Sequence, residues 1–121
     1  MAKHHITVAI KRVYDAPESG DGTRILVDRL WPRGLSKERA KVDVWLKEVA
    51  PSNDLRKWFG HDPDKFAEFR RRYEAELESE SGQEALTKLR DLAGQGHTTL
   101  VYAARDSEHN NAVVLRDVLR G

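Results

Sequence analysis

The feature that most constrains this sequence is a continuous apolar run that ends abruptly in charged residues. Residues 25–27 are Ile-Leu-Val, and such runs are typical of strands that are covered on both faces of a parallel sheet. Asp28 and Arg29 follow at once, and Pro32 cannot continue a central strand because it lacks a backbone N–H. We therefore predict a central strand over 24–30 whose carboxyl end opens into a polar loop.

A second segment, near the end of the chain, has the same organisation. Residues 98–103 are Thr-Thr-Leu-Val-Tyr-Ala, which predicts a strand, and residues 110–119 have the apolar spacing of a helix. Between them lie the polar residues 105–111, Arg-Asp-Ser-Glu-His-Asn-Asn. Ligands of open α/β sheets bind beyond the carboxyl ends of the strands, so we expect the two polar loops to meet there and form one site.

The other segments complete a simple strand and helix pattern. Residues 6–13 predict a first strand, and residues 14–23 predict a polar loop that is either a long hairpin connection or a flap. Residues 42–49 fit either a short strand passing into a helical turn or one irregular helix, and we favour the strand. Apolar strands separated by helices indicate an α/β fold: one small domain over 1–121, with a mainly parallel sheet of about four strands flanked by helices.

Three helix starts are expected in the middle of the chain. Ser52 is a good N-cap, as is Asp62, which is followed by Pro63 at the first helical position. Ser81 and Glu84 have the spacing of a capping box, in which each side chain accepts a hydrogen bond from the other residue's backbone N–H. The apolar stripes of these helices are Leu55, Trp58 and Phe59, then Phe66, Phe69, Tyr73 and Leu77, and then Leu86, Leu89 and Leu92 or Ala93.

The composition excludes several classes of function. The chain contains no cysteine, so disulfides, thiolate catalysis and cysteine-based zinc sites are ruled out. No apolar run approaches the roughly 20 residues of a membrane span, and the first residues lack the apolar centre of a signal peptide. We therefore expect a cytoplasmic protein without a membrane partner. Lys and Arg total 21 against 20 Asp and Glu, a balance that makes nucleic acid a less favoured partner.

The two polar loops carry groups that suit a small anionic ligand, such as a phosphorylated metabolite or a nucleotide. Guanidinium groups bind oxyanions through paired hydrogen bonds, and the start of the last helix adds backbone N–H donors. A structural alternative is that Asp28 and Arg29 only pair with each other, and that Asn110 or Ser107 only caps the last helix. The candidate ligand-binding residues are Arg29, Trp31, Arg33, Arg105, Asn110 and Asn111.

A hydrolase or transferase reaction at this site would need acid/base groups, for which Asp28, His61 and His109 are the candidates. No nucleophile motif, phosphate-binding loop or dinucleotide fingerprint is present, so the sequence identifies no cofactor. The histidines and aspartates also lack the spacing of metal ligands.

A second class of function is a regulatory module that binds nucleic acid or a protein partner. Its basic surface would consist of Arg56, Lys57 and the consecutive arginines 70–72. The alternative for those arginines is a solvated helix face on which they pair with Glu74, Glu76 and Glu78 at helical spacing.

Several motifs resemble one known family over nearly the whole chain. They are residues 11–15 (KRVYD), 27–34 (VDRLWPRG), 45–47 (WLK), 50–52 (APS), 55–59 (LRKWF) with 61–62 (HD), and 102–106 (YAARD) with 109–112 (HNNA). These segments are similar to the YeaO-like branch of the bacterial and archaeal domain of unknown function 488 family. The resemblance implies a small cytosolic α/β domain and no particular reaction.

The other branch of that family has a Val-Asp-Val-Arg strand end and a Cys-His-Arg start to its last helix, which invites comparison with rhodanese-like or phosphatase-like anion loops. The corresponding positions here are Asp28, Arg29 and residues 109–111, His-Asn-Asn. Without the cysteine, any thiol mechanism of relatives is excluded for this chain.

Overall fold

Residues 7–121 are described by this computed structural model, and they fold around a parallel sheet of four strands. The strands are β1 (Val8–Arg12), β2 (Thr23–Leu26), β3 (Val44–Trp45) and β4 (Thr98–Tyr102), in the order β1-β4-β2-β3. All three strand pairings are parallel, which confirms the predicted α/β fold. Ile6, where the expected first strand begins, lies outside the described residues.

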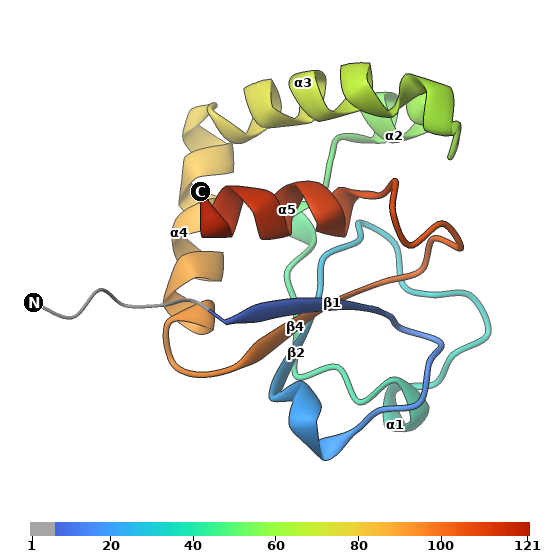
Figure 1. The fold of residues 1–121 in the computed structure, drawn as a ribbon, viewed down its shortest axis with the longest axis vertical. Coiled ribbons are helices and arrows are strands. Elements are labelled where there is room, and N and C mark those ends of the chain that lie inside the picture. Colours follow the sequence, from blue (N-terminus) through green and yellow to red (C-terminus); the bar gives the residue numbers. More distant parts are fainter. Residues whose placement is uncertain (1–6) are drawn as a thin grey trace, which may run out of the picture.

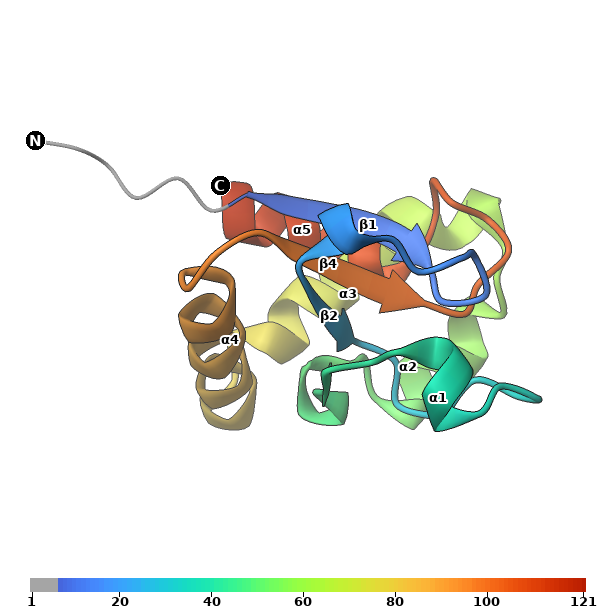
Figure 2. The same cartoon turned by 90° about the horizontal axis from the view of Figure 1, so that it is seen from below.

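Helices cover both faces of this sheet. They are α1 (Lys37–Ala40), α2 (Asn53–Phe59), α3 (Phe66–Leu77), α4 (Glu80–Ala93) and α5 (Asn111–Arg120), with short 3-10 helices at Ser19–Asp21, Lys47–Val49 and Pro63–Lys65. Figures 1 and 2 show α3 and α5 on one side of the sheet and α1 on the other. Within residues 7–121, no helix combines the length and the apolar character that crossing a membrane requires.

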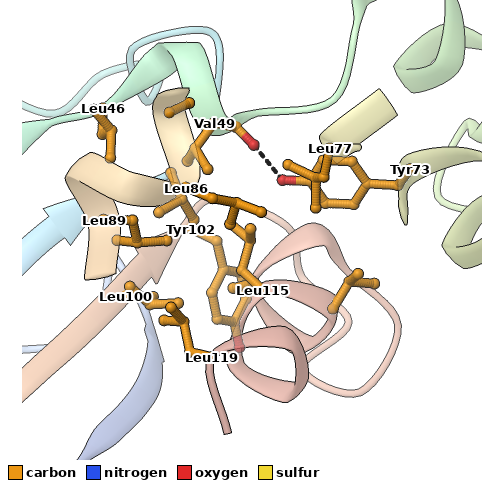
Figure 3. Packing of buried hydrophobic residues seen from close by; sticks show 14 of the residues in the cluster. Leu46, Val49, Tyr73, Leu77, Leu86, Leu89, Leu100, Tyr102, Leu115 and Leu119 are labelled. Atoms are coloured by element: carbon orange, nitrogen blue, oxygen red, sulfur yellow. Dashed lines mark hydrogen bonds between the residues drawn. The ribbon is translucent and has the colours of Figure 1, made fainter. Parts of the chain in front are cut away.

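The strands build a core on each face because successive side chains of a strand point to opposite sides. Ile25 joins the large core with side chains of α2 to α5, whereas Leu26 joins a smaller cluster with Ala40 of α1. In the large core, the Tyr73 hydroxyl donates a hydrogen bond to the Val49 carbonyl (Figure 3). A buried hydroxyl without a partner is costly, so this bond fixes α3 against the Lys47–Val49 turn.

Most of the expected local signals are confirmed. Residues 42–49 form the short strand β3 followed by a 3-10 turn, as the favoured alternative predicted. The predicted N-cap of α2, Ser52, accepts a hydrogen bond from the Leu55 N–H at 3.1 Å. Asp62 caps the Pro63–Lys65 turn, where its carboxylate accepts from the Asp64 N–H at 3.0 Å.

The predicted capping box at Ser81 is wrong. The N-cap of α4 is Ser79, whose hydroxyl accepts from the Gly82 N–H at 3.1 Å, so Ser81 lies inside the helix. The chain leaves α3 at Leu77 and turns at once into α4, which brings Gly82 against the backbone of Glu76 and Leu77. A side chain at Gly82 would collide there, and this close approach places the helix start two residues earlier than the capping pattern suggests.

The hairpin alternative for the loop at 14–23 is also wrong. Strands β1 and β2 are not neighbours, because β4 lies between them and pairs with both. The loop passes over β4 and is anchored by Asp21. This residue is only 8% exposed although it lies in a polar stretch of the sequence.

Asp21 lies at the centre of a buried charge cluster, which we call the Asp21 network. Its carboxylate accepts from Arg24 at 2.7 Å and from Lys11 at 3.2 Å. Arg24, 3% exposed, also donates to the carbonyls of Ala40 at 2.8 Å and Lys41 at 3.1 Å. The network therefore joins β1, β2 and the end of α1 near the amino end of β2.

Candidate functional site

A cavity of about 550 Å³ lies at the carboxyl edge of the sheet. Loops that follow β1, β2 and β4 form one part of it, and α2 with the start of α3 forms the rest. In Figure 2 the arrowheads of β1 and β4 point toward this edge, where the loop before α5 lies. We call this space the strand-end cavity, lined by Tyr14, Pro51, Arg56, Phe59, His61, Phe69 and residues of 28–33, 103–106 and 110–111.

Eight of the nine candidate residues named from the sequence line this one cavity. Only His109 does not. The expectation that two polar strand ends lie together therefore agrees with the geometry, while the chemical roles of the residues stay predictions. The eight lining residues are Asp28, Arg29, Trp31, Arg33, His61, Arg105, Asn110 and Asn111.

Asp28 is anchored in the wall of the cavity by its neighbours. One carboxylate oxygen accepts from the Ala103 N–H at 2.8 Å, and the other accepts from the Asn111 side chain at 3.1 Å. Burial raises the pKa of Asp28, and these two hydrogen bonds and the charges of His61 and Arg56 only partly offset it. Asp28 thus ties the β2 loop to the β4 loop and is a carboxyl group with altered acidity inside a cavity.

The three arginines predicted to hold a ligand differ in how far they are already engaged. Arg29 donates to the carbonyls of Pro51 and Ala50, both at 3.1 Å, so two of its five N–H donors already serve the fold. The side chains of Arg33 and Arg105 are exposed, and within residues 7–121 neither forms an ion pair or a side-chain hydrogen bond. Arg33 and Arg105 are therefore the ones free to bind an anion.

Arg56 is the cavity residue that sequence reasoning assigned elsewhere. It lies on α2, and its Nε is a buried nitrogen without a hydrogen-bond partner in the described residues. Its one side-chain hydrogen bond is a long contact of 3.5 Å to Asn53. The sequence grouped Arg56 with Lys57 as a basic surface; the available signal was its spacing of three from Phe59, which puts both on one face of α2.

Aromatic side chains form much of the wall. Phe59 and Phe69 stack with ring centroids 4.3 Å apart, and both are nearly buried. On the opposite loops, the Trp31 indole donates to the Leu35 carbonyl at 2.6 Å and the Tyr14 hydroxyl donates to the Arg33 carbonyl at 2.8 Å. The cavity thus has rigid apolar walls with cationic groups at its edge.

The structural alternative for Asn110 is correct, since it caps α5. Its side-chain oxygen accepts from the Val113 N–H at 3.0 Å, and its amide donates to the Asp106 carbonyl at 2.8 Å. Asn110 is 1% exposed, so it shapes the cavity while its polar atoms are engaged.

His109 turns away from the cavity toward α3. Its Nδ1 lies 2.8 Å from the Asp106 carboxylate, and its ring packs edge-on against Phe66 with centroids 5.2 Å apart. Hydrogen bonds from the Glu108 N–H and from His109 lower the pKa of Asp106, which does line the cavity.

His61 stands at the cavity in an unusual backbone conformation. Its φ is +60°, directly after Gly60 at +54°, in the left-handed region that non-glycine residues seldom adopt. Strain of this kind costs about 1–3 kcal/mol and is common at functional sites.

We expect His61→Gly to stabilise the fold and weaken ligand binding. Glycine removes the strain but adds unfolded-state entropy, so the free energy of unfolding should rise by about 0.5–1 kcal/mol in urea denaturation. The matched control is Lys41→Gly, because Lys41 is the other non-glycine residue with positive φ in the described part of the chain, at +48°. It lies outside the cavity, so Lys41→Gly should stabilise the fold without changing binding. Unchanged binding in His61→Gly would remove His61 from the site.

The arginine run on α3 is ion-paired, although not with the predicted partners. Arg70 pairs with Asp117 of α5 at 2.8 Å, and Arg71 and Arg72 pair with Glu68. Of the three glutamates expected to pair with these arginines, Glu76 instead accepts hydrogen bonds from the backbone and hydroxyl of Ser52, which holds α2 against α3.

Among residues 7–121, no three His, Cys, Asp or Glu side chains gather as a metal site.

Comparisons with known proteins place the sequence within one family. The family model described as "Inactive DUF488-N3 subclade" matches residues 7–121. The chain is 46% identical over 115 residues to the uncharacterized protein YeaO of Escherichia coli K12, covering 95% of this chain and 98% of that protein. It is 43% identical over 114 residues to the uncharacterized protein Rv3073c of Mycobacterium tuberculosis H37Rv, covering 94% of each.

No solved structure matches the chain significantly. The match to the family model covers all described residues, and the YeaO-like resemblance of the sequence motifs is confirmed. The chain belongs to the inactive DUF488-N3 subclade.

Proposed function

We propose that this protein binds a small anionic or phosphorylated ligand in the strand-end cavity, as a cytoplasmic small-molecule-binding protein. The observation that carries the proposal is that the arginines 33, 56 and 105 line one aromatic-walled cavity and have no carboxylate partner within residues 7–121. Four arginines and two aspartates line the space, so it favours negative charge. Its volume of about 550 Å³ lies within the usual range of small-molecule sites.

Binding without turnover is favoured over a hydrolase or transferase reaction. The family model carries the word "inactive" in its description, and the chain has no cysteine nucleophile. Asp28 and His61 line the cavity, where they could exchange protons with a ligand. No serine or threonine among the described residues lines the cavity beside them, and the Tyr14 hydroxyl is engaged with a backbone carbonyl. The ion-paired state of arginines 70–72 likewise weighs against the alternative of a regulatory module for nucleic acid.

We expect Arg33→Ala combined with Arg105→Ala to weaken anion binding about 10- to 100-fold with little change in stability. Each arginine would supply charge-assisted hydrogen bonds worth about 1.5–3 kcal/mol at most to the ligand, and partial exposure reduces that value. Thermal unfolding should be recorded with phosphate, sulfate, citrate, sugar phosphates and nucleoside monophosphates. A ligand at 100 times its Kd stabilises the wild type by about 2.7 kcal/mol.

The matched control is Lys88→Ala combined with Arg90→Ala, because these two exposed cations lie on α4 outside the cavity. The control pair should bind like the wild type. The proposal fails if no anion of the panel stabilises the wild type, or if the cavity pair and the control pair have equal affinity.

A further inference from the structure

The buried Nε of Arg56 defines one requirement for the ligand. Buried donors without an acceptor are rare in folded proteins, and this one belongs to a side chain that lines the strand-end cavity. An acceptor atom on a bound molecule would satisfy it. Arg56 lies on α2 and its Nε is buried, so that acceptor would lie inside the cavity.

Asp28 defines a second requirement for the ligand, which is a hydrogen-bond donor. An ionised carboxylate is an acceptor with about four lone-pair sites, and the structure fills two of them, from Ala103 and Asn111. Asp28 and Arg56 line the same cavity, so one bound molecule can reach both the free donor and the free acceptor. A ligand group that fits both carries a hydrogen-bond acceptor beside an N–H or O–H donor.

An oxyanion without a proton, such as sulfate, meets only the first requirement, because it accepts from Arg56 but has no donor for Asp28 and is repelled by its charge. The edge of a nitrogen heterocycle meets both, since a ring nitrogen or carbonyl accepts and an adjacent N–H donates. The walls suit such a ring: Phe59, Phe69, Trp31 and Tyr14 line the cavity, and base–aromatic stacking is favourable for any flat ring.

We propose that the ligand contains a flat nitrogen heterocycle linked to an anionic group. Arg56 and Asp28 form hydrogen bonds with the edge of the heterocycle, and Arg33 and Arg105 bind the anionic group. Mononucleotides are the common molecules of this class. The inference rests on the proposed function and adds the identity of the ring. It also gives the arginines different tasks: Arg56 binds the ring edge, and the two exposed arginines bind the phosphate.

The test compares probes that contain the ring, the phosphate or a carbocyclic ring. Calorimetric titration of the wild type with AMP, GMP, CMP and UMP should show at least one nucleotide that binds at least tenfold more tightly than ribose 5-phosphate and phenyl phosphate. Ribose 5-phosphate lacks the base, and phenyl phosphate has a flat ring without a polar edge. Equal affinity for all of these probes would overturn the ring inference and leave the anion proposal standing.

Substitution of Arg56 separates its role from simple charge. Arg56→Met should keep the fold, because the side chain makes only a 3.5 Å hydrogen bond, and should lower affinity for the preferred nucleotide about tenfold or more while barely changing that for ribose 5-phosphate. The control is Lys57→Met, an exposed neighbour on α2 that does not line the cavity. Equal loss of both probes in Arg56→Met would show that Arg56 binds phosphate and would overturn the inference.

Failure of this inference can be told apart from failure of the proposed function. If none of the four nucleotides binds, the ring inference is overturned. The anion-binding proposal falls only if phosphate, sulfate, citrate and the sugar phosphates of its own panel fail as well.

Discussion

Arg24→Met is expected to lower the free energy of unfolding by about 3–5 kcal/mol, measured by urea denaturation at pH 7. The guanidinium of Arg24 donates to the buried Asp21 carboxylate at 2.7 Å and to two backbone carbonyls. Methionine fills part of the volume but leaves Asp21 charged, buried and held by Lys11 without its closest partner. The loss of the closest partner of a buried charge, together with the donor of two backbone carbonyls, is one of the few changes that produce so large an effect.

Two comparisons isolate the cause. Arg72→Met removes an exposed ion pair with Glu68 and should cost no more than about 1 kcal/mol. Adding Asp21→Asn to Arg24→Met should recover part of the loss, because the buried charge is then absent. A loss below about 1 kcal/mol in Arg24→Met would contradict the account of the Asp21 network.

The effect of Arg24→Met should also depend on pH. Burial raises the pKa of Asp21, but hydrogen bonds from the Glu18 N–H, Lys11 and Arg24 outweigh it, so the net pKa is lowered. A carboxyl group with a lowered folded pKa contributes stability that is present above its unfolded pKa of about 3.9 and is lost as pH falls through the folded value. The difference between wild type and Arg24→Met should therefore shrink below about pH 4.

Sequence patterns predicted the sheet edge of this protein because only topology was needed. Once residues 25–27 and 98–103 are recognised as parallel strands, the loops after them must meet at one edge, whatever their side chains do. The cap at Ser52 was equally local, since the side chain and the N–H it accepts from are three residues apart. Such features depend on short stretches of chain.

The features that the sequence could not supply depend on long-range packing. Arg29 and Arg33 are alike in sequence, yet only Arg29 reaches the carbonyls of Ala50 and Pro51, which lie just before α2. Arg56 becomes a cavity residue for the same reason, because the placement of α2 depends on Ser52 bonding to Glu76 of α3. The spacing of Arg56 from Phe59 indicates only a shared face of α2, and no spacing in the sequence encodes the contacts that place α2.

Asp28→Ala is expected to destabilise the protein by about 3 kcal/mol, and Asp28→Asn by clearly less. Alanine leaves the Ala103 N–H without an acceptor and leaves the Asn111 amide with only the Val27 carbonyl, and each lost hydrogen bond to a buried group costs about 1–3 kcal/mol. Asparagine keeps one acceptor oxygen and removes the charge. Urea denaturation at pH 7 measures both values, and equal losses in the two variants would show that the charge, and not the hydrogen bonds, is what the fold requires.

The pH dependence of Asp28 should run opposite to that of Asp21. Burial raises the folded pKa of Asp28, so its contribution to stability is fully present below the unfolded pKa of about 3.9 and is lost as pH rises through the folded value. We therefore compare the free energy of unfolding of the wild type with that of each variant between pH 3 and pH 8. The wild-type value minus the Asp28→Asn value should fall as the pH rises, whereas the wild-type value minus the Asp21→Asn value should rise. Curves of the same sign would show that the strand-end cavity does not desolvate Asp28. A falling curve means that ionised Asp28 is held at a cost to the fold, which a ligand N–H donor would reduce by lowering the pKa of Asp28.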